Sequence, residues 1–241
     1  MNYLKSEHLK FKRSISNKIL WIAPLFTTIL AWVIGGFTGF QYLTFYWWYM
    51  FLLPGAIAIL CSLSHQKEER AGKYYSIFSM PLNLTRFEVA KSIILIEKLL
   101  IAALFLAAFT AISNLISPAT VVYSIGRSIV GSIGIVLVSI WQIPFCLFLA
   151  RKAGVFIPVI LNSSLCILLP TALGNTNFWW LFPYCWTAKL AQPLMGIELN
   201  GTFTGSYRFT MIIPTVFVLS LLLFAVFSLL DTKSFAKQEE K

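Results

Sequence analysis

Residues 64–91 of the chain are SHQKEERAGKYYSIFSMPLNLTRFEVAK. This polar stretch separates two apolar runs, 45–63 and 92–113, and holds eight of the 28 charged residues. A helix needs about 20 apolar residues to cross the hydrocarbon core of a bilayer. Both runs are close to this length, so we expect two transmembrane helices joined by a polar connection outside the lipid.

The composition of the whole chain indicates a membrane protein. Of 241 residues, 58% are hydrophobic and 12% are charged, and the mean hydropathy is +0.78. A soluble domain has about 45–50% apolar and about 25% charged residues, and one soluble core of this size could not bury so much apolar surface. The net charge of +10 would suggest a nucleic-acid partner for a soluble chain. Here the basic residues lie between apolar runs, so we expect no nucleic acid.

Working outward from residues 64–91, six apolar runs are long enough to span a bilayer. Helices are the expected conformation because an open strand would leave backbone polar groups unpaired in lipid. The sequence therefore predicts an all-α membrane protein with a single transmembrane domain over residues 1–241. The expected spans cover about residues 19–37, 45–63, 92–113, 128–150, 155–173 and 210–230.

The basic residues predict how these spans are oriented, because cytoplasmic connections of membrane proteins are enriched in Lys and Arg. With a cytoplasmic N-terminus, the inner segments hold 15 of the 19 Lys and Arg residues. The outer segments hold only Arg127, Lys189 and Arg208, and Lys98 lies near the mouth of the third span. We therefore expect both termini in the cytoplasm.

Residues 1–18 are predicted to form an amphipathic helix that lies on the membrane surface. Its apolar side chains recur at helical spacing, and its basic residues lie elsewhere, which is typical of a helix in the headgroup region. Alternatively, these charges only orient the first span. The apolar stripe consists of Leu4, His8, Phe11, Ile15 and Ile19.

Residues 64–91 are predicted to form an ordered element, a helix followed by a proline and a second helix. Pro81 ends the first helix. Thr85 and Glu88 match a capping box, which would begin the helix of the third span in the cytoplasm. The first helix covers about residues 66–80, and one of its faces carries Ala71, Tyr74, Tyr75 and Phe78.

The predicted outer segment, residues 174–209, is rich in aromatic side chains. Such rings favour the membrane interface, so an ordinary aromatic belt is one interpretation. The other is a half-inserted element that contacts a lipidic or amphipathic cargo, with aromatic residues before the second span on the same side. The candidate cargo contacts are Trp47, Trp48, Trp179, Trp180, Phe182, Tyr184 and Trp186.

The chain lacks the phosphate-binding motif GxxxxGK[ST]. If ATP drives transport, ATP and Mg²⁺ therefore bind to a separate ATPase that contacts residues 64–91, and we expect no catalytic residue, cofactor or metal in this chain. Glu97 is either an ion-paired residue at the cytoplasmic rim or a coupling group within the third span. An alternative enzyme function would use His65, Glu68 and Glu69 as an intramembrane metalloprotease does, but both histidines lie outside the predicted spans.

Two stretches resemble the permease subunits of type-2 ABC exporters. The first is the basic lead-in MNYLKSEHLKFKRSISNKILWIAP, and the second is EERAGKYYSIFSMPLNLTRFEVAK, a helix, a proline and a lysine-bearing entry to the third span. Together they are most similar to the lantibiotic-immunity branch of bacterial plasma-membrane permeases.

The resemblance implies a connecting helix at the N-terminus and re-entrant outer helices at residues 177–195. It also implies that a coupling helix docks onto an ABC ATPase, present in two copies, beside a second permease that is a sister or an identical subunit. The ATPase-coupling residues would be Glu68, Glu69, Arg70, Lys73, Tyr74, Tyr75 and Phe78.

The cargo implied by the resemblance is an amphipathic antimicrobial peptide, expelled from the membrane to give self-immunity. The chain departs from an acidic capture site, because Glu198 is the only acidic residue in the predicted outer segments. Aromatic contacts would then do most of the binding. A passive immunity protein that binds the peptide without pumping is the other alternative.

Overall fold

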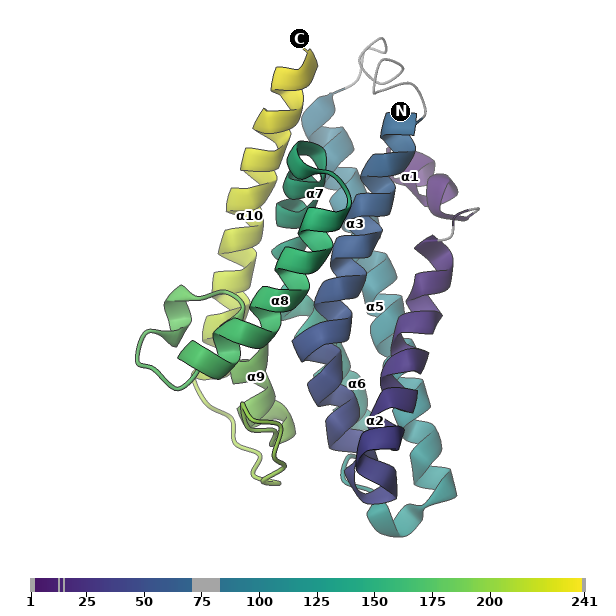
Figure 1. Cartoon of the computed structure of the whole chain (residues 1–241), viewed down its shortest axis with the longest axis vertical. Coiled ribbons are helices and arrows are strands. Elements are labelled where there is room, and N and C mark those ends of the chain that lie inside the picture. Colours follow the sequence, from purple (N-terminus) through teal and green to yellow (C-terminus); the bar gives the residue numbers. More distant parts are fainter. Residues whose placement is uncertain (1–2, 13, 15, 71–82, 240–241) are drawn as a thin grey trace.

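The computed structural model describes residues 3–12, 14, 16–70 and 83–239. Most of these residues are helical, and they contain no strand beyond an isolated bridge between Ile197 and Phe203. Figure 1 shows long helices that run side by side along the molecule. The α-helices are α1 (Tyr3–Lys12), α2 (Ser16–Trp47), α3 (Leu53–Arg70), α5 (Leu84–Ile116), α6 (Ile125–Ser139), α7 (Gln142–Ala153), α8 (Phe156–Leu173), α9 (Cys185–Met195) and α10 (Ile212–Glu239). Shorter elements are the π-helix η1 (Trp48–Leu52) and the 3₁₀ turns η2 (Pro118–Thr120) and η3 (Trp179–Leu181).

Four helical segments of the described chain are long and apolar enough to cross a membrane. They are Ser16–Arg70, Leu84–Ile116, Phe156–Leu173 and Ile212–Ala236. The pair of α6 and α7 makes a fifth candidate if it is one bent span. The all-helical, multi-pass architecture is thus confirmed, with four to five candidate spans where the sequence predicts six.

One span of this difference comes from the first candidate, which is 55 residues long and covers two of the predicted spans. Its helix is interrupted at Gly36, whose φ of 55° and ψ of −153° are not helical. Glycine tolerates positive φ because it has no Cβ. Figure 1 shows the chain turning back between the first part of α2 and α3, so that these two segments run in opposite directions. The expected connection at 38–44 is helical, and the break lies at Gly36 instead.

The fourth predicted span, 128–150, is not straight. α6 and α7 meet at an angle of 45°, and the backbone amide of Ile143 bonds to the carbonyl of Ile140 at 3.0 Å. Pro144 has no amide to donate to that same carbonyl in an α-helical bond. The proline therefore accounts for the bend.

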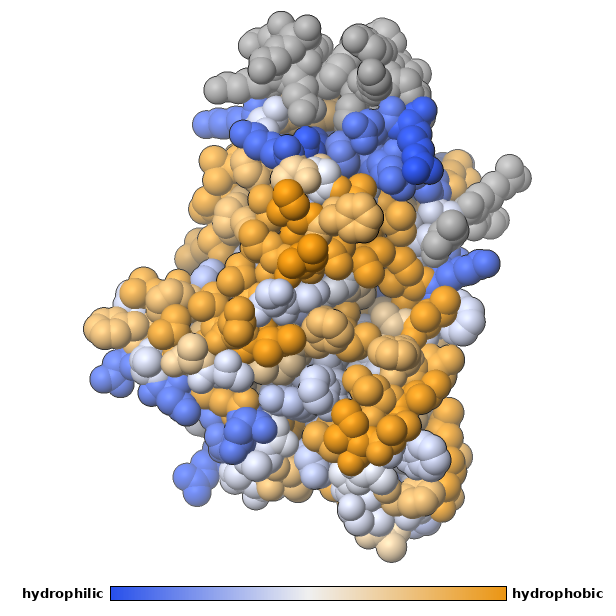
Figure 2. Space-filling model, viewed as in Figure 1, coloured by the Kyte–Doolittle hydropathy of each residue, from blue (hydrophilic) through white to orange (hydrophobic). Residues whose placement is uncertain are grey.

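The surface of the molecule is apolar along most of its length. Figure 2 shows a broad hydrophobic band, with hydrophilic residues gathered at the end where the termini lie. Large apolar side chains such as Val33, Phe156 and Leu229 are more than half exposed. Only 11% of the most apolar stretch of α10 is buried in the protein. Lipid is the solvent that this surface fits.

At the hydrophilic end, one local prediction is wrong and another stays a prediction. In the predicted interfacial helix of residues 1–18, Leu4 is 43% exposed, as a side chain that faces lipid would be, while Glu7 and Phe11 are buried. The helix ends at Lys12 and Ile15 lies outside the described residues, so the position of this segment on the membrane surface stays a prediction. The cap of α5 is Asn83, whose side chain accepts from the amide of Arg86 at 3.0 Å, so Thr85 and Glu88 form no capping box.

Candidate functional site

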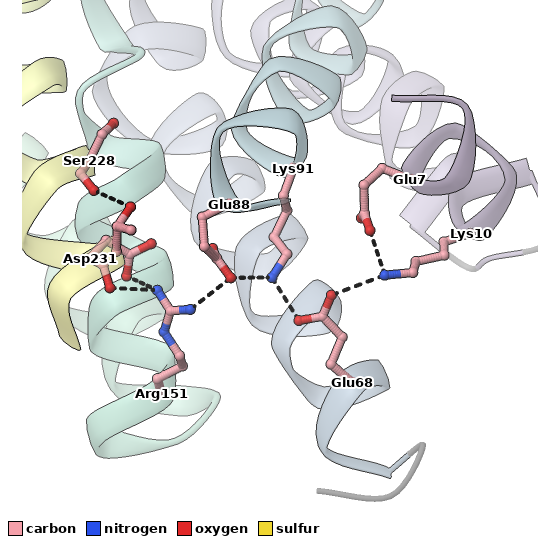
Figure 3. A network of polar contacts seen from close by, with 9 residues as sticks. Glu7, Lys10, Glu68, Glu88, Lys91, Arg151, Ser228 and Asp231 are labelled. Atoms are coloured by element: carbon pink, nitrogen blue, oxygen red, sulfur yellow. Dashed lines mark hydrogen bonds and ion pairs between the residues drawn. The ribbon is translucent and has the colours of Figure 1, made fainter. Parts of the chain in front are cut away.

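Five helices meet at the hydrophilic end of the bundle, and each contributes ionisable side chains to one connected cluster (Figure 3). We call this cluster the ionic network. It consists of Glu7 and Lys10 of α1, Glu68 of α3, Glu88 and Lys91 of α5, Arg151 of α7 and Asp231 of α10.

Lys91 lies at the centre of the ionic network, and its side chain is 1% exposed. Its Nζ donates to Glu68 Oε2 at 2.6 Å and to Glu88 Oε1 at 3.0 Å. Both carboxylates are buried as well. An ammonium group is removed from water at a large cost, which only close and well-formed ion pairs offset. The position of Lys91 therefore depends on both acids.

Arg151 extends the ionic network to α10. Its Nη1 lies 3.0 Å from Glu88 Oε1, and its Nη2 pairs with the carboxylate of Asp231. The side chains of all three residues are 3% exposed. A guanidinium group can bind two carboxylates in fixed directions, so α5, α7 and α10 are held in one arrangement.

The N-terminal helix is attached to the same cluster. Lys10 Nζ donates to Glu7 and, at 3.2 Å, to Glu68 Oε1. Lys67 of α3 donates to the carbonyl of Lys10 at 2.8 Å. Burial raises the pKa of Glu7 above its ordinary value, and the charge of Lys10 opposes this only in part. α1 is thus fixed to the end of α3 by charged groups, in addition to its contacts with α5.

Two aromatic rings cover the cations of the ionic network. Phe87 and Phe235 stack with their centroids 6.2 Å apart. Lys91 lies 4.8 Å from the Phe87 ring and Arg151 lies 4.8 Å from the Phe235 ring. Cation–π contacts of this kind strengthen where water is excluded. The rings therefore stabilise the buried charges without neutralising them.

The ionic network joins the two arms that flank residues 71–82. Glu68 lies in the last turn of α3, and Glu88 and Lys91 lie in the first two turns of α5. A displacement of either arm therefore changes the ion pairs of Lys91. Through Glu88 and Glu68 that change reaches α7, α10 and α1. The geometry can transmit a movement at residues 64–91 to most of the bundle.

Comparison with known families assigns the chain to a family of membrane proteins. Residues 3–169 match the model of the ABC-2 family transporter proteins. The chain belongs to this family. ABC-2 permeases are the membrane subunits of ABC transporters, are generally non-catalytic and normally work with an ATPase subunit. Searches of curated proteins and of solved structures found no significant match.

The structure of this ABC-2 permease places the predicted coupling residues in different environments. Glu68 is 6% exposed and belongs to the ionic network, so its carboxylate is not available to a docking partner in this conformation, and its coupling role stays a prediction. Glu69 is 57% exposed and lies 3.7 Å from His65, and Arg70 is exposed. The other coupling residues, Lys73, Tyr74, Tyr75 and Phe78, lie outside the described residues.

The predicted cargo contacts are divided in the same way. Trp48, Tyr184 and Trp186 are buried and pack within the protein, so they are not exposed to a cargo in this conformation, and their role as cargo contacts stays a prediction. Tyr184 and Trp186 are buried because α9 packs against α6 and α10, and Trp141 meets the Tyr184 ring at 4.9 Å. The other predicted cargo contacts are more accessible. Trp180 is 48% exposed, and three are half-buried, namely Trp47, Trp179 and Phe182.

Six members of the ionic network were not predicted from the sequence as functional residues: Glu7, Lys10, Glu88, Lys91, Arg151 and Asp231. A signal was present for the last four, because they lie within four residues of the cytoplasmic end of a predicted span. Charged residues at that common depth on neighbouring helices can pair. The pairing itself depends on which helices are neighbours, and the apolar pattern does not specify this.

Glu97 and the metal-site alternative can also be compared with the structure. Glu97 is 44% exposed, pairs with Lys98 at 3.2 Å and lies 3.7 Å from His8, which fits the ion-paired interpretation. Within the described part of the chain, no three His, Cys, Asp or Glu side chains are close enough to hold a metal ion. The metalloprotease alternative therefore gains no support.

Proposed function

We propose that the chain is the permease subunit of an ATP-driven exporter and that residues 64–91 form the contact with its ATPase. The observation that carries the proposal is the ionic network, which joins both arms of this segment to α1, α7 and α10. ATP and Mg²⁺ bind to the partner chain, and ATP-driven movement there displaces the segment. The change in the ion pairs of Lys91 then passes to the spans.

We further propose six spans with both termini in the cytoplasm. The Gly36 turn divides Ser16–Arg70 into two antiparallel spans, and the bent pair of α6 and α7 counts as one. The remaining spans are α5, α8 and α10. The five helices of the ionic network meet at the end where both termini lie in Figure 1, which supports a common cytoplasmic side.

The assembly that we propose contains this chain, a second permease that is a sister or an identical subunit, and two ATPase copies in a bacterial plasma membrane. The apolar helix faces of the chain fit lipid and a neighbouring permease equally well. The match to the ABC-2 family supports an ATPase partner without specifying copy number.

The proposed cargo is an amphipathic, lantibiotic-like peptide, and its export gives self-immunity. An apolar groove of about 310 Å³ between α2 and α5 supports this class of cargo, since its lining includes Trp32, Phe37 and Phe109. An acidic side chain contributes little to binding of the peptide, because the Glu198 carboxylate already accepts a hydrogen bond from Gln192 at 2.6 Å. Apolar and aromatic contact would provide most of the affinity.

Co-purification from the native membrane tests the proposal. We expect the chain to carry an ATPase with it, and we expect the double substitution Glu69→Ala and Tyr75→Ala to abolish both this association and peptide export. Glu97→Ala is the matched control, because it removes a half-exposed acid of α5 that lies outside residues 64–91. Normal export and ATPase association in the double variant would contradict the proposal. Peptide protection that survives deletion of the ATPase would favour a passive binding protein.

A further inference from the structure

A second cavity lies at the opposite end of α10 from the ionic network. It has a volume of about 510 Å³, and its lining includes Arg127, Leu194, Tyr207, Arg208 and Ile213. At about 1.5 Å per residue, the part of α10 from Ile213 to Asp231 is roughly 27 Å long, close to the thickness of the hydrocarbon core. The cavity therefore lies at the other boundary of the lipid.

Two arginines, Arg127 and Arg208, line this cavity. Neither of them forms an ion pair with an acidic side chain of the described residues. The Arg127 guanidinium lies 3.3 Å from the centroid of the Tyr207 ring, and its one hydrogen bond to a described residue is a long contact of 3.5 Å to the Leu194 carbonyl. Arg208 is exposed, and among the described residues only its backbone amide is bonded, to the Pro193 carbonyl at 3.2 Å. Glu198, the one acid of this region, is bonded to Gln192. The cavity has an excess of positive charge.

The remaining lining combines open backbone with apolar side chains. Gly126 lies in the first turn of α6, and no atom lies within 4 Å of the place where a Cβ would be. A bulky group can therefore approach the first turn of this helix, whose free amides add to the positive field. Val130, Leu194 and Ile213 line the same cavity and offer apolar contact to a hydrocarbon chain.

The combination of two arginines and an apolar lining defines the chemistry of a ligand for this cavity. Arginine binds phosphate with two parallel hydrogen bonds, and it is the preferred residue for that purpose. A phosphate group alone would leave the apolar lining without a partner. We propose that the cavity binds the phosphate of a membrane phospholipid, with the acyl chains along α6 and α10. This site is separate from the proposed ATPase contact and does not depend on transport.

Native mass spectrometry of the full chain in detergent tests this site, with dimyristoyl phosphatidic acid as the probe. We expect Arg127→Gln combined with Arg208→Gln to weaken lipid binding by about tenfold or more, because two charge-assisted contacts are lost. Lys189→Gln is the matched control, since it removes one cation at the same end but outside the cavity lining. We expect it to leave the Kd within about twofold, because its side chain does not line the cavity.

Two further probes distinguish the source of the phosphate. Dimyristoyl glycerol has the same chains without phosphate, and inorganic phosphate has no chains. We expect neither to bind as tightly as the phosphatidic acid. Equal binding of dimyristoyl glycerol, or of inorganic phosphate, would overturn the proposal. So would an unchanged Kd in the double variant or an equal loss with Lys189→Gln.

The single substitution Arg208→Gln keeps the proposal testable if the double variant does not fold. The side chain of Arg208 is exposed, so its loss leaves the packing intact. We expect this variant to lose phosphatidic acid binding by several-fold, about the effect of one charge-assisted hydrogen bond. An unchanged affinity in folded Arg208→Gln protein would contradict a role for this arginine and with it the proposed site.

Discussion

At the scale of single residues, Lys91 is the position on which the ionic network depends. Its ammonium group lies between Glu68 and Glu88, and all three side chains are nearly inaccessible to water. A buried ion pair adds little net stability compared with apolar packing, whereas removing one partner leaves an uncompensated charge. The consequence of losing Lys91 therefore differs from that of losing a surface lysine.

We predict that Lys91→Met lowers the free energy of unfolding by about 3–5 kcal/mol, because two buried carboxylates lose their common cation. Lys98→Met on the same helix is the control. Its partner Glu97 is 44% exposed and remains solvated, so we expect a loss of about 1 kcal/mol or less. Denaturant unfolding in detergent measures both variants. Equal losses would show that the ionic network has no special role in stability.

Glu7 gives a pH-dependent prediction. Burial raises the pKa of this carboxyl above its ordinary value of 4.5, against the opposing charge of Lys10, while Glu68 raises it further and Lys91 lowers it. A raised pKa in the folded state means that the contribution to stability is complete below about pH 4.5 and is lost as the pH rises through the raised value. We predict that α1 is held less firmly at neutral pH than at acidic pH.

Hydrogen exchange of the α1 amides, corrected for the intrinsic rate at each pH, measures this effect. The variant Glu7→Gln has no carboxyl to titrate, so its protection should change much less with pH. Glu69→Gln is the control, because this acid is 57% exposed and is not part of the ionic network. A pH dependence in Glu7→Gln equal to that of the unmodified chain would contradict the assignment to Glu7.

At the scale of elements, Gly36 determines how the first helical run is divided. Its φ of 55° is disfavoured for every residue with a Cβ, even though no neighbouring atom would meet that Cβ. We predict that Gly36→Ala lowers the free energy of unfolding by about 1–2 kcal/mol through backbone strain alone. Gly126→Ala is the control, because the same open space surrounds a helical residue there. It should be neutral or stabilise by up to about 1 kcal/mol. Similar effects of both substitutions in denaturant unfolding would rule out strain at Gly36.

The helical class of most elements could be predicted from the sequence, while their ends and interruptions could not. A long apolar run indicates a span because lipid admits only hydrogen-bonded helices or barrels. The turn at Gly36 and the cap at Asn83 depend on local backbone bonds that hydropathy does not describe. α9 is a further case, because aromatic content predicted an interface for a helix that packs in the core.

The sequence predicted where along the chain the candidate site lies, but not which side chains pair there. The charge of residues 64–91 indicated a functional surface, and Glu69 and Arg70 are exposed there. Glu68 has the same chemistry but faces the protein, and its partner Lys91 is 23 positions away along the chain. Sequence spacing cannot specify a contact between two helices whose relative rotation is set by packing. The ionic network required the structure.

At the scale of the whole molecule, charge is concentrated in one layer at one end of an apolar bundle. That layer joins the N-terminal helix, the ends of α3 and α5 that flank residues 71–82, and the helices α7 and α10 (Figure 3). Apolar helix contacts in lipid have no directional preference of their own, whereas ion pairs have defined partners. In the proposed function, the ionic network is therefore the defined connection through which a partner ATPase acts on the spans.

The most direct test of this account measures peptide exported per ATP hydrolysed by the permease–ATPase complex in proteoliposomes. Glu68→Gln removes a charge from the ionic network without altering the exposed residues Glu69 and Arg70. We predict that its complex assembles and hydrolyses ATP but exports about tenfold less peptide per ATP, the size of a typical coupling free energy. Glu97→Gln should leave the ratio unchanged. An unchanged ratio in Glu68→Gln would contradict transmission through the ionic network.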